Sequence, residues 1–136
     1  MAHSIQILGQ KTAILPDEDL IIVICIMNLV TSDADKYKVL SPYIERWRHN
    51  LTGYAPGCIN LNLEVLSACN EGLTELSTAL TAVEQRIGAY GETIPGRVLN
   101  DLCQIEGIYF ADYPANSVLR GIEAIRKLLA PTEMKR

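Results

Sequence analysis

The sequence is poor in aromatic residues, in histidine and in recognisable motifs. Its 136 residues include one Trp, one Phe and six Tyr, so a core built from them must be mainly aliphatic. The two histidines, His3 and His49, are too few for a multi-histidine metal site, and we expect no bound metal. The glycines match neither the dinucleotide-binding loop nor the P-loop, and we expect no cofactor.

Long apolar runs and paired cysteines are also lacking. The longest apolar run, residues 20–30, is too short to cross a bilayer as a helix. The N-terminus has no basic region followed by an apolar one, which is the pattern of a secretory signal. Four cysteines lie far apart, without a C-x-x-C pair: Cys25, Cys58, Cys69 and Cys103. This spacing favours buried free thiols in a reducing compartment, and we expect a cytoplasmic protein without membrane contact.

Acidic residues outnumber basic ones, and the excess is concentrated in the middle of the chain. The net charge is −4 at pH 7 and the isoelectric point is about 5.1. Residues 53–95 carry five glutamates and a single basic residue, Arg86. An acidic chain argues against nucleic acid as a partner.

Apolar residues recur at spacings of three and four along most of the chain, which is the period of an amphipathic helix. The pattern predicts helices over residues 33–51, 66–87, 98–109 and 118–129, the first with a break or a new start at Ser41–Pro42. The pattern is strongest over 66–87, where a narrow apolar seam includes Cys69. Either the stripe at 37–51 or a second copy of the chain can cover this seam, so a homo-oligomer is an alternative.

Three further segments are less distinct. Residues 20–30 are rich in β-branched side chains and resemble a buried strand, but Asp17, Glu18 and Asp19 precede them. Because carboxylates stabilise the N-terminus of a helix, we expect a fully buried helix there. Residues 4–15 fit a short hairpin or an extended arm, and the alternation over 59–65 favours a short strand or an extended lead-in.

These patterns together predict a single domain over residues 1–136. Its fold class is all-α: a compact bundle of about five helices, with room for a short N-terminal hairpin. The alternative is an α+β fold in which residues 4–15, 59–65 and 20–30 form a small sheet.

Charged side chains are densest at residues 45–49. On a helix, Glu45 and His49 share a face, so Glu45 can orient His49 for acid–base catalysis. Arg46 and Arg48 can bind phosphate or carboxylate, and Cys58 is a candidate nucleophile if folding brings a base close to it. The alternative is a solvated helix face whose Glu45–His49 pair adds about 0.2–0.5 kcal/mol of stability.

The acidic middle of the chain supplies a second candidate site. Its glutamates include Glu64, Glu71, Glu75 and Glu84. Such a surface can steer a basic partner, or it can simply keep the protein soluble. Since no catalytic motif is present, we expect a non-enzymatic module that binds another protein as an adaptor, a chaperone, or an inhibitor or immunity protein for a basic partner. The alternative is a small cytosolic enzyme with its site at Glu45, Arg46, Arg48 and His49.

Overall fold

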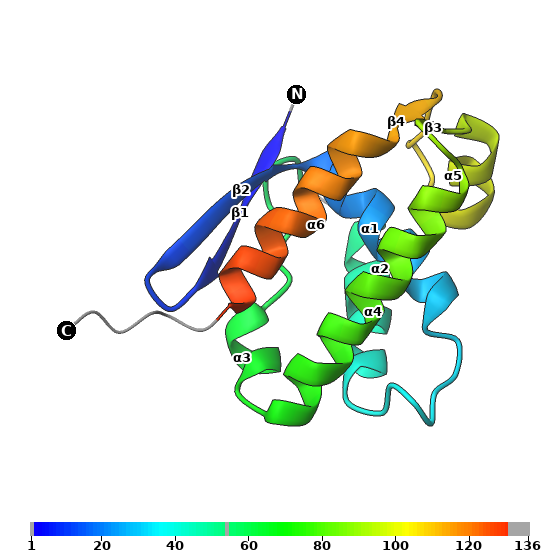
Figure 1. The fold of residues 1–136 in the computed structure, drawn as a ribbon. Coiled ribbons are helices and arrows are strands. Elements are labelled where there is room, and N and C mark those ends of the chain that lie inside the picture. Colours follow the sequence, from blue (N-terminus) through cyan, green and yellow to red (C-terminus); the bar gives the residue numbers. More distant parts are fainter. Residues whose placement is uncertain (1, 54, 131–136) are drawn as a thin grey trace.

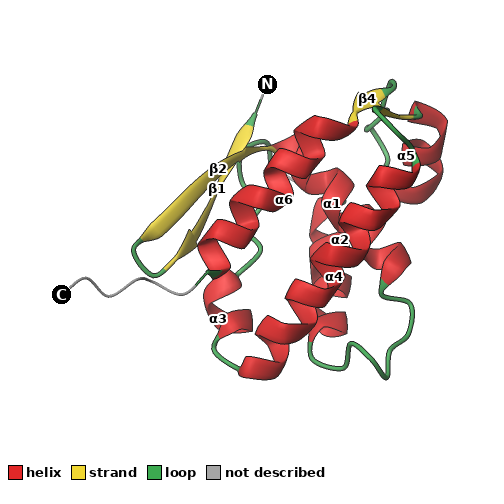
Figure 2. Ribbon diagram, in the orientation of Figure 1, coloured by secondary structure: helices red, strands yellow, loops and turns green. Residues whose placement is uncertain are grey.

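The computed structural model describes residues 2–53 and 55–130, which form six helices and two small antiparallel sheets around one apolar core (Figures 1 and 2). In chain order the elements are β1 (His3–Leu8), β2 (Lys11–Pro16), α1 (Asp17–Val30), α2 (Leu40–Leu51), α3 (Leu63–Ser67), α4 (Asn70–Ala89), β3 (Thr93–Ile94), α5 (Gly96–Cys103), β4 (Tyr113–Pro114) and α6 (Ala115–Leu129). The predicted helical class and the N-terminal hairpin are confirmed. No helix of the described residues is both long enough and apolar enough to cross a membrane.

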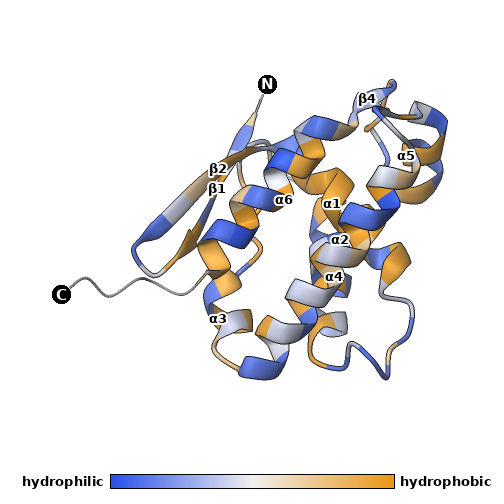
Figure 3. Cartoon of the chain, viewed as in Figure 1, coloured by the Kyte–Doolittle hydropathy of each residue, from blue (hydrophilic) through white to orange (hydrophobic). Residues whose placement is uncertain are grey.

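Helix α1 is the centre of the fold. Its residues from Leu20 to Met27 are all buried, and it contacts α2, α4, α5, α6 and β2 (Figure 3). A helix that is apolar on every side is stable only when other elements surround it. The prediction of a buried helix here is confirmed, and the alternative in which this run is a strand is wrong.

The surrounding helices bury the predicted stripes against α1. Helix α2 buries Leu40, Ile44, Trp47 and Leu51, and α6 buries Val118, Ile122 and Ile125. The seam of α4 is covered within the same chain, mainly by α1 and α6 and to a smaller extent by α3 and α2. One copy of the chain therefore buries the seam from Leu76 to Ile87.

The predicted helix over residues 66–87 is two helices. Helix α3 ends at Ser67 and α4 begins at Asn70. Cys69 lies between them in an extended conformation, and the expectation that it is a core residue is wrong: it is exposed, and its Sγ accepts a hydrogen bond from the Gly72 amide at 3.2 Å. A Cβ on Gly72 would lie 2.5 Å from the Leu66 carbonyl oxygen, so glycine is needed where the two helices turn.

Two other predicted helices are shorter than their patterns. Residues 34–39 form turns and α2 begins at Leu40, which agrees with the predicted new start at Ser41–Pro42, although the residue at the N-cap is Val39 and not Ser41. Tyr37 is buried as its place in the stripe requires. The predicted 98–109 helix ends at Cys103, because Gln104 adopts a left-handed conformation with φ of 46°. Tyr109, predicted to lie on the apolar stripe, is 85% exposed.

The N-terminal hairpin faces the core with polar residues. Leu8 pairs with Lys11 across the turn, and this register turns Ser4 and Gln6 of β1 inward and Ile5 and Ile7 outward. Ser4 and Gln6 are buried, whereas Ile5 and Ile7 are 54% and 52% exposed. Burial of Ile5 and Ile7 would require the opposite orientation of β1, since a one-residue slip exchanges the two faces. The observed orientation instead buries Leu15 of β2, which pairs with Ser4.

The inward polar residues hold an extended segment of the chain. The side chain of Gln6 donates to the Ile59 carbonyl at 2.7 Å and accepts from the Leu61 amide at 2.9 Å. Ser4 Oγ donates to Asp17 at 2.5 Å and accepts from the Ile59 amide at 3.0 Å. Residues 59–61 thus form the predicted lead-in to the next helix and not a strand. It ends at Asn62, which has a left-handed backbone with φ of 53°, and α3 begins at Leu63, within the 59–65 pattern.

Candidate functional site

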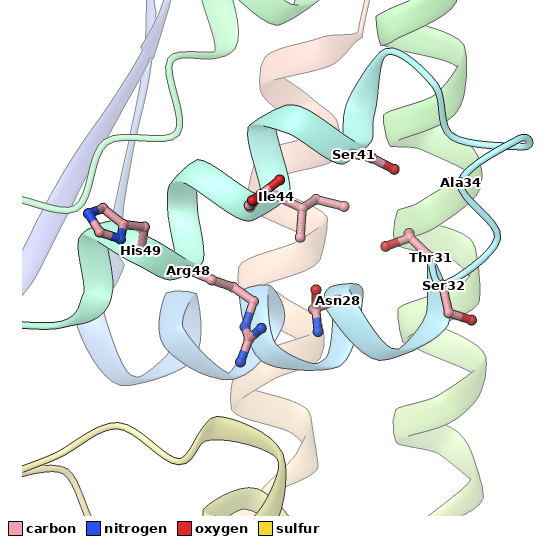
Figure 4. Close-up of a pocket in the computed structure, with 9 residues that line it drawn as sticks. Asn28, Thr31, Ser32, Ala34, Ser41, Ile44, Arg48 and His49 are labelled. Atoms are coloured by element: carbon pink, nitrogen blue, oxygen red, sulfur yellow. The ribbon is translucent and has the colours of Figure 1, made fainter.

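A groove of about 650 Å³ lies between the C-terminal end of α1 and helix α2 (Figure 4). Its lining includes three of the four residues of the predicted polar cluster, namely Glu45, Arg48 and His49. The other lining residues are Asn28, Thr31, Ser32, Ala34, Ser41 and Ile44. The helical spacing of α2 brings the three charged or ionisable residues to this face, and the packing of α2 on α1 supplies the hydroxyl and amide groups opposite them.

The four residues of the polar cluster do not act as one unit. Figure 4 shows the Arg48 side chain extending toward Asn28, while the His49 ring lies at the far end of the groove from Ser41. The guanidinium of Arg46 lies 5.6 Å from the centre of the Tyr43 ring, outside the groove lining. No hydrogen bond or ion pair joins Glu45 to His49 in the described part of the chain. The groove therefore offers binding groups but no oriented histidine.

The cysteines supply no nucleophile paired with His49. Cys58 is exposed and lines a separate, smaller groove beside Trp47 and Asn50. Cys25 and Cys103 are buried where α1 packs on α5. A hydrogen bond with Cys103, together with burial, raises the pKa of the Cys25 thiol above its usual value, so Cys25 is a neutral core residue. All four cysteines are free thiols, but only two are buried as expected.

Three of the four glutamates proposed to face a partner are held by contacts within the chain. Glu64 accepts a hydrogen bond from the Gly9 amide at 3.1 Å. Glu75 accepts from two backbone amides, those of Val39 and Leu40, at 3.0 Å each. Glu84 forms an ion pair of 2.7 Å with Arg126, while Glu71 is exposed at the start of α4.

The contact of Glu75 gives this residue a structural role that we can test. The N-terminus of α2 has no capping side chain of its own, and the Glu75 carboxylate of α4 takes that place. We expect Glu75→Ala to lower the free energy of unfolding by about 1–2 kcal/mol, the usual cost of a lost helix cap. Chemical denaturation followed by circular dichroism measures this.

Glu71→Ala is the matched control, since Glu71 is one turn away on the same helix and is exposed. It should change stability by less than about 0.5 kcal/mol. Equal effects of the two substitutions would contradict the capping role. A reversal of charge at Glu75 would likewise disturb the fold, so only Glu71 is suited to testing the acidic face for binding.

The candidate binding residues that the sequence analysis missed are exposed apolar side chains. Ile5, Ile7 and Ile14 of the hairpin and Val65 of α3 are between 52% and 64% exposed, and we call these four residues the hairpin face. Ile5 and Ile14 are direct cross-strand partners. The sequence shows that Ile5 and Ile7 alternate with Ser4 and Gln6, but it does not show which of the two sets faces water.

A third groove, of about 410 Å³, runs along the hairpin face beside β1. It is lined by Ile5 and Ile7 on the hairpin and by residues of the 60–65 segment, which are Asn60, Asn62, Leu63, Glu64 and Val65. One ionisable side chain, that of Glu64, lies among these lining residues.

Comparisons with known proteins add no relative: no protein-family model matches the chain, and neither the curated proteins nor the solved structures that were searched include a significant match.

Proposed function

We propose that this protein is a non-enzymatic module that binds another protein through the hairpin face. The observation that carries the proposal is the orientation of the hairpin, which buries Ser4 and Gln6 and leaves Ile5, Ile7 and Ile14 in water. Scattered exposed apolar residues are common on proteins, but adjoining ones on one face mark a site of interaction. The opposite arrangement would bury these three isoleucines but expose Leu15, which packs in the core. A binding role gives the exposed isoleucines a purpose.

The proposed partner is basic, because the protein has a net negative charge. The four glutamates contribute differently to the attraction of such a partner. Glu64 adjoins the hairpin face and is exposed, although its Oε1 accepts from the Gly9 amide, and Glu71 is exposed on α4. Glu75 and Glu84 are engaged within the chain, so they add to the general field more than to direct contacts. An adaptor, a chaperone, or an inhibitor or immunity protein would each use such a surface. The proposed place of action is the cytoplasm, where four free thiols remain reduced.

Photo-crosslinking in the native host tests the proposal. A photoreactive amino acid at position 14, on the hairpin face, should form an adduct with another protein. The same amino acid at position 85, which is exposed on the polar side of α4, is the matched control and should form none. Combining Ile5→Asp with the probe at position 14 should reduce the adduct about tenfold, because a charge would have to be buried in an apolar contact. Adducts of equal yield from both positions, or none from position 14, would refute the proposal.

The groove between α1 and α2 supports a second candidate function, that of a small enzyme or a small-molecule binder. The observation in its favour is that Glu45, Arg48 and His49 line one groove together with hydroxyl and amide groups. The crosslinking experiment also separates the two candidates. His49→Ala should leave the adduct at position 14 unchanged, whereas loss of a cellular activity on this substitution, with the fold intact by circular dichroism, would favour the enzyme.

A further inference from the structure

The free edge of β1 has unused backbone hydrogen-bonding groups. In an antiparallel pair, residues alternate between those that bond to the partner strand and those whose amide and carbonyl point away from it. Gly9 and Gln10 form a two-residue turn, so Leu8 and Lys11 are a hydrogen-bonded pair. Bonded pairs recur at every second residue, so the even-numbered residues of β1 are the ones whose amides and carbonyls bond to β2. The Asp17 amide accordingly donates to the Ala2 carbonyl at 3.0 Å.

The odd-numbered residues Ile5 and Ile7 therefore direct their amides and carbonyls away from β2. In residues 2–53 and 55–130, no hydrogen bond reaches these four groups, and the sheet has only two strands. The same two residues contribute their side chains to the groove beside β1. Backbone donors and acceptors thus stand at the side of a groove whose lining combines the exposed side chains of Ile5, Ile7 and Val65 with polar side chains of residues 60–64. An unpaired strand edge of this kind can accept an added strand.

The far side of this groove is fixed before any partner arrives. Gln6 and Ser4 hold the 59–61 backbone by three hydrogen bonds, and the Trp47 indole donates a fourth to the Leu61 carbonyl at 3.0 Å. A pre-organised groove loses less conformational entropy on binding than one that must form.

The size and charge of the surface indicate the occupant. Four half-exposed apolar side chains make a patch of a few hundred Å². A stable protein pair usually buries about 800 Å² on each side, so this patch is small for a dimer of the chain but adequate for a peptide. Glu64, which borders the groove, favours a basic residue in that peptide.

We infer that β1 binds an extended segment of a partner protein as a third strand, and that this segment has apolar side chains at alternate positions and a lysine or arginine near Glu64. This inference rests on the proposed function and specifies its partner. Main-chain hydrogen bonds to Ile5 and Ile7 give the affinity, and the groove and Glu64 give the preference for sequence.

The test uses a synthetic peptide of alternating valine and threonine with a lysine at each end. NMR measures the hydrogen exchange rates and the chemical shifts of the backbone amides of Ile5 and Ile7. Addition of the peptide should protect both amides, while the backbone amide of Gln6, which already bonds to β2, should not change. A control peptide methylated at alternate backbone nitrogens keeps its side chains but loses its donors, and it should bind at least about tenfold more weakly. Glutamate in place of the terminal lysines should also weaken binding, and Glu64→Gln should remove most of this difference.

The outcomes distinguish this inference from the proposed function. Crosslinking at position 14 without protection of Ile5 and Ile7 by the peptide, or equal binding of the methylated peptide, would overturn strand addition and leave a protein contact through side chains alone. Protection of the same amides by raising the concentration of the protein itself, without peptide, would show a second copy as the occupant and would also overturn it. Failure of crosslinking alone would count against the proposed function.

Discussion

Replacement of Gln6 by Leu is expected to lower the free energy of unfolding by about 3 kcal/mol, although it exchanges a buried polar side chain for an apolar one of similar size. Gln6 is 1% exposed, and its amide group bonds to the Ile59 carbonyl and the Leu61 amide. Leucine would leave both backbone groups buried without partners. The penalty for two such groups exceeds the gain from the added apolar contact.

The single tryptophan reports on this change directly. Trp47 is buried and donates to the Leu61 carbonyl, within the segment that Gln6 holds. Urea denaturation followed by its fluorescence therefore measures both the loss of stability and any change in the native environment. Gln85→Leu makes the same chemical exchange at an exposed position of α4 and should alter stability by less than about 0.5 kcal/mol. If Gln6→Leu and Gln85→Leu had the same free energy of unfolding, the hydrogen bonds of Gln6 would only balance the cost of removing its side chain from water, and the prediction would be wrong.

The helices that could be predicted from the sequence are those whose burial depends on local spacing. The stripes of α2, α4 and α6 carry the helical period in their own residues, and most of each stripe is buried as predicted, while Leu73 and Leu129 at the stripe ends are half-buried. The run from Leu20 to Met27 lacks a polar face, and its acidic start was enough to identify it as a helix. In each case the signal lies within one helix.

The helix ends were mispredicted where contacts from outside the helix decide them. The apolar spacing continues from Leu66 through Cys69 to Leu73, but the close approach of Gly72 to the Leu66 carbonyl separates two helices there. The start of α2 at Leu40 depends on the Glu75 carboxylate, which is 35 residues away in sequence. The first contact has no local signature, whereas Ser41–Pro42 did indicate a new start close to Leu40.

Of the two candidate sites, one could be predicted from the spacing within a helix and the other depends on contacts between distant residues. Glu45, Arg48 and His49 lie within one helical turn, so their common groove follows from the helix itself. The hairpin face could not be predicted, because residue type alone places isoleucine inside and serine and glutamine outside. The orientation is reversed because Ser4 and Gln6 have partners near residue 60, and only the folded chain brings these together. The hydrogen bonds that cause this reversal also form one side of the proposed peptide groove.

Replacement of Asp19 by Ala is expected to lower the free energy of unfolding by about 3 kcal/mol, through the loss of charge-assisted hydrogen bonds. Asp19 is 2% exposed near the start of α1, where a carboxylate is also favoured by the helix dipole. Its Oδ1 accepts from the Tyr113 hydroxyl at 2.5 Å, and the Ser117 hydroxyl lies 2.9 and 3.0 Å from its two oxygens. The substitution would release β4 and the first turn of α6 from α1. Thermal and urea denaturation measure the loss.

Asp101→Ala, on the exposed side of α5, is the matched control and should cost less than about 0.5 kcal/mol. Alkaline pH gives an independent readout of the same contact. Burial and the bond to Asp19 raise the pKa of Tyr113 above its usual value near 10, so the folded state disfavours its ionisation. The stability that this tyrosine contributes is complete below about pH 10 and declines as the pH rises above it. Tyr113→Phe should remove that part of the alkaline decline, whereas an unchanged slope would show that the hydroxyl gains nothing from Asp19.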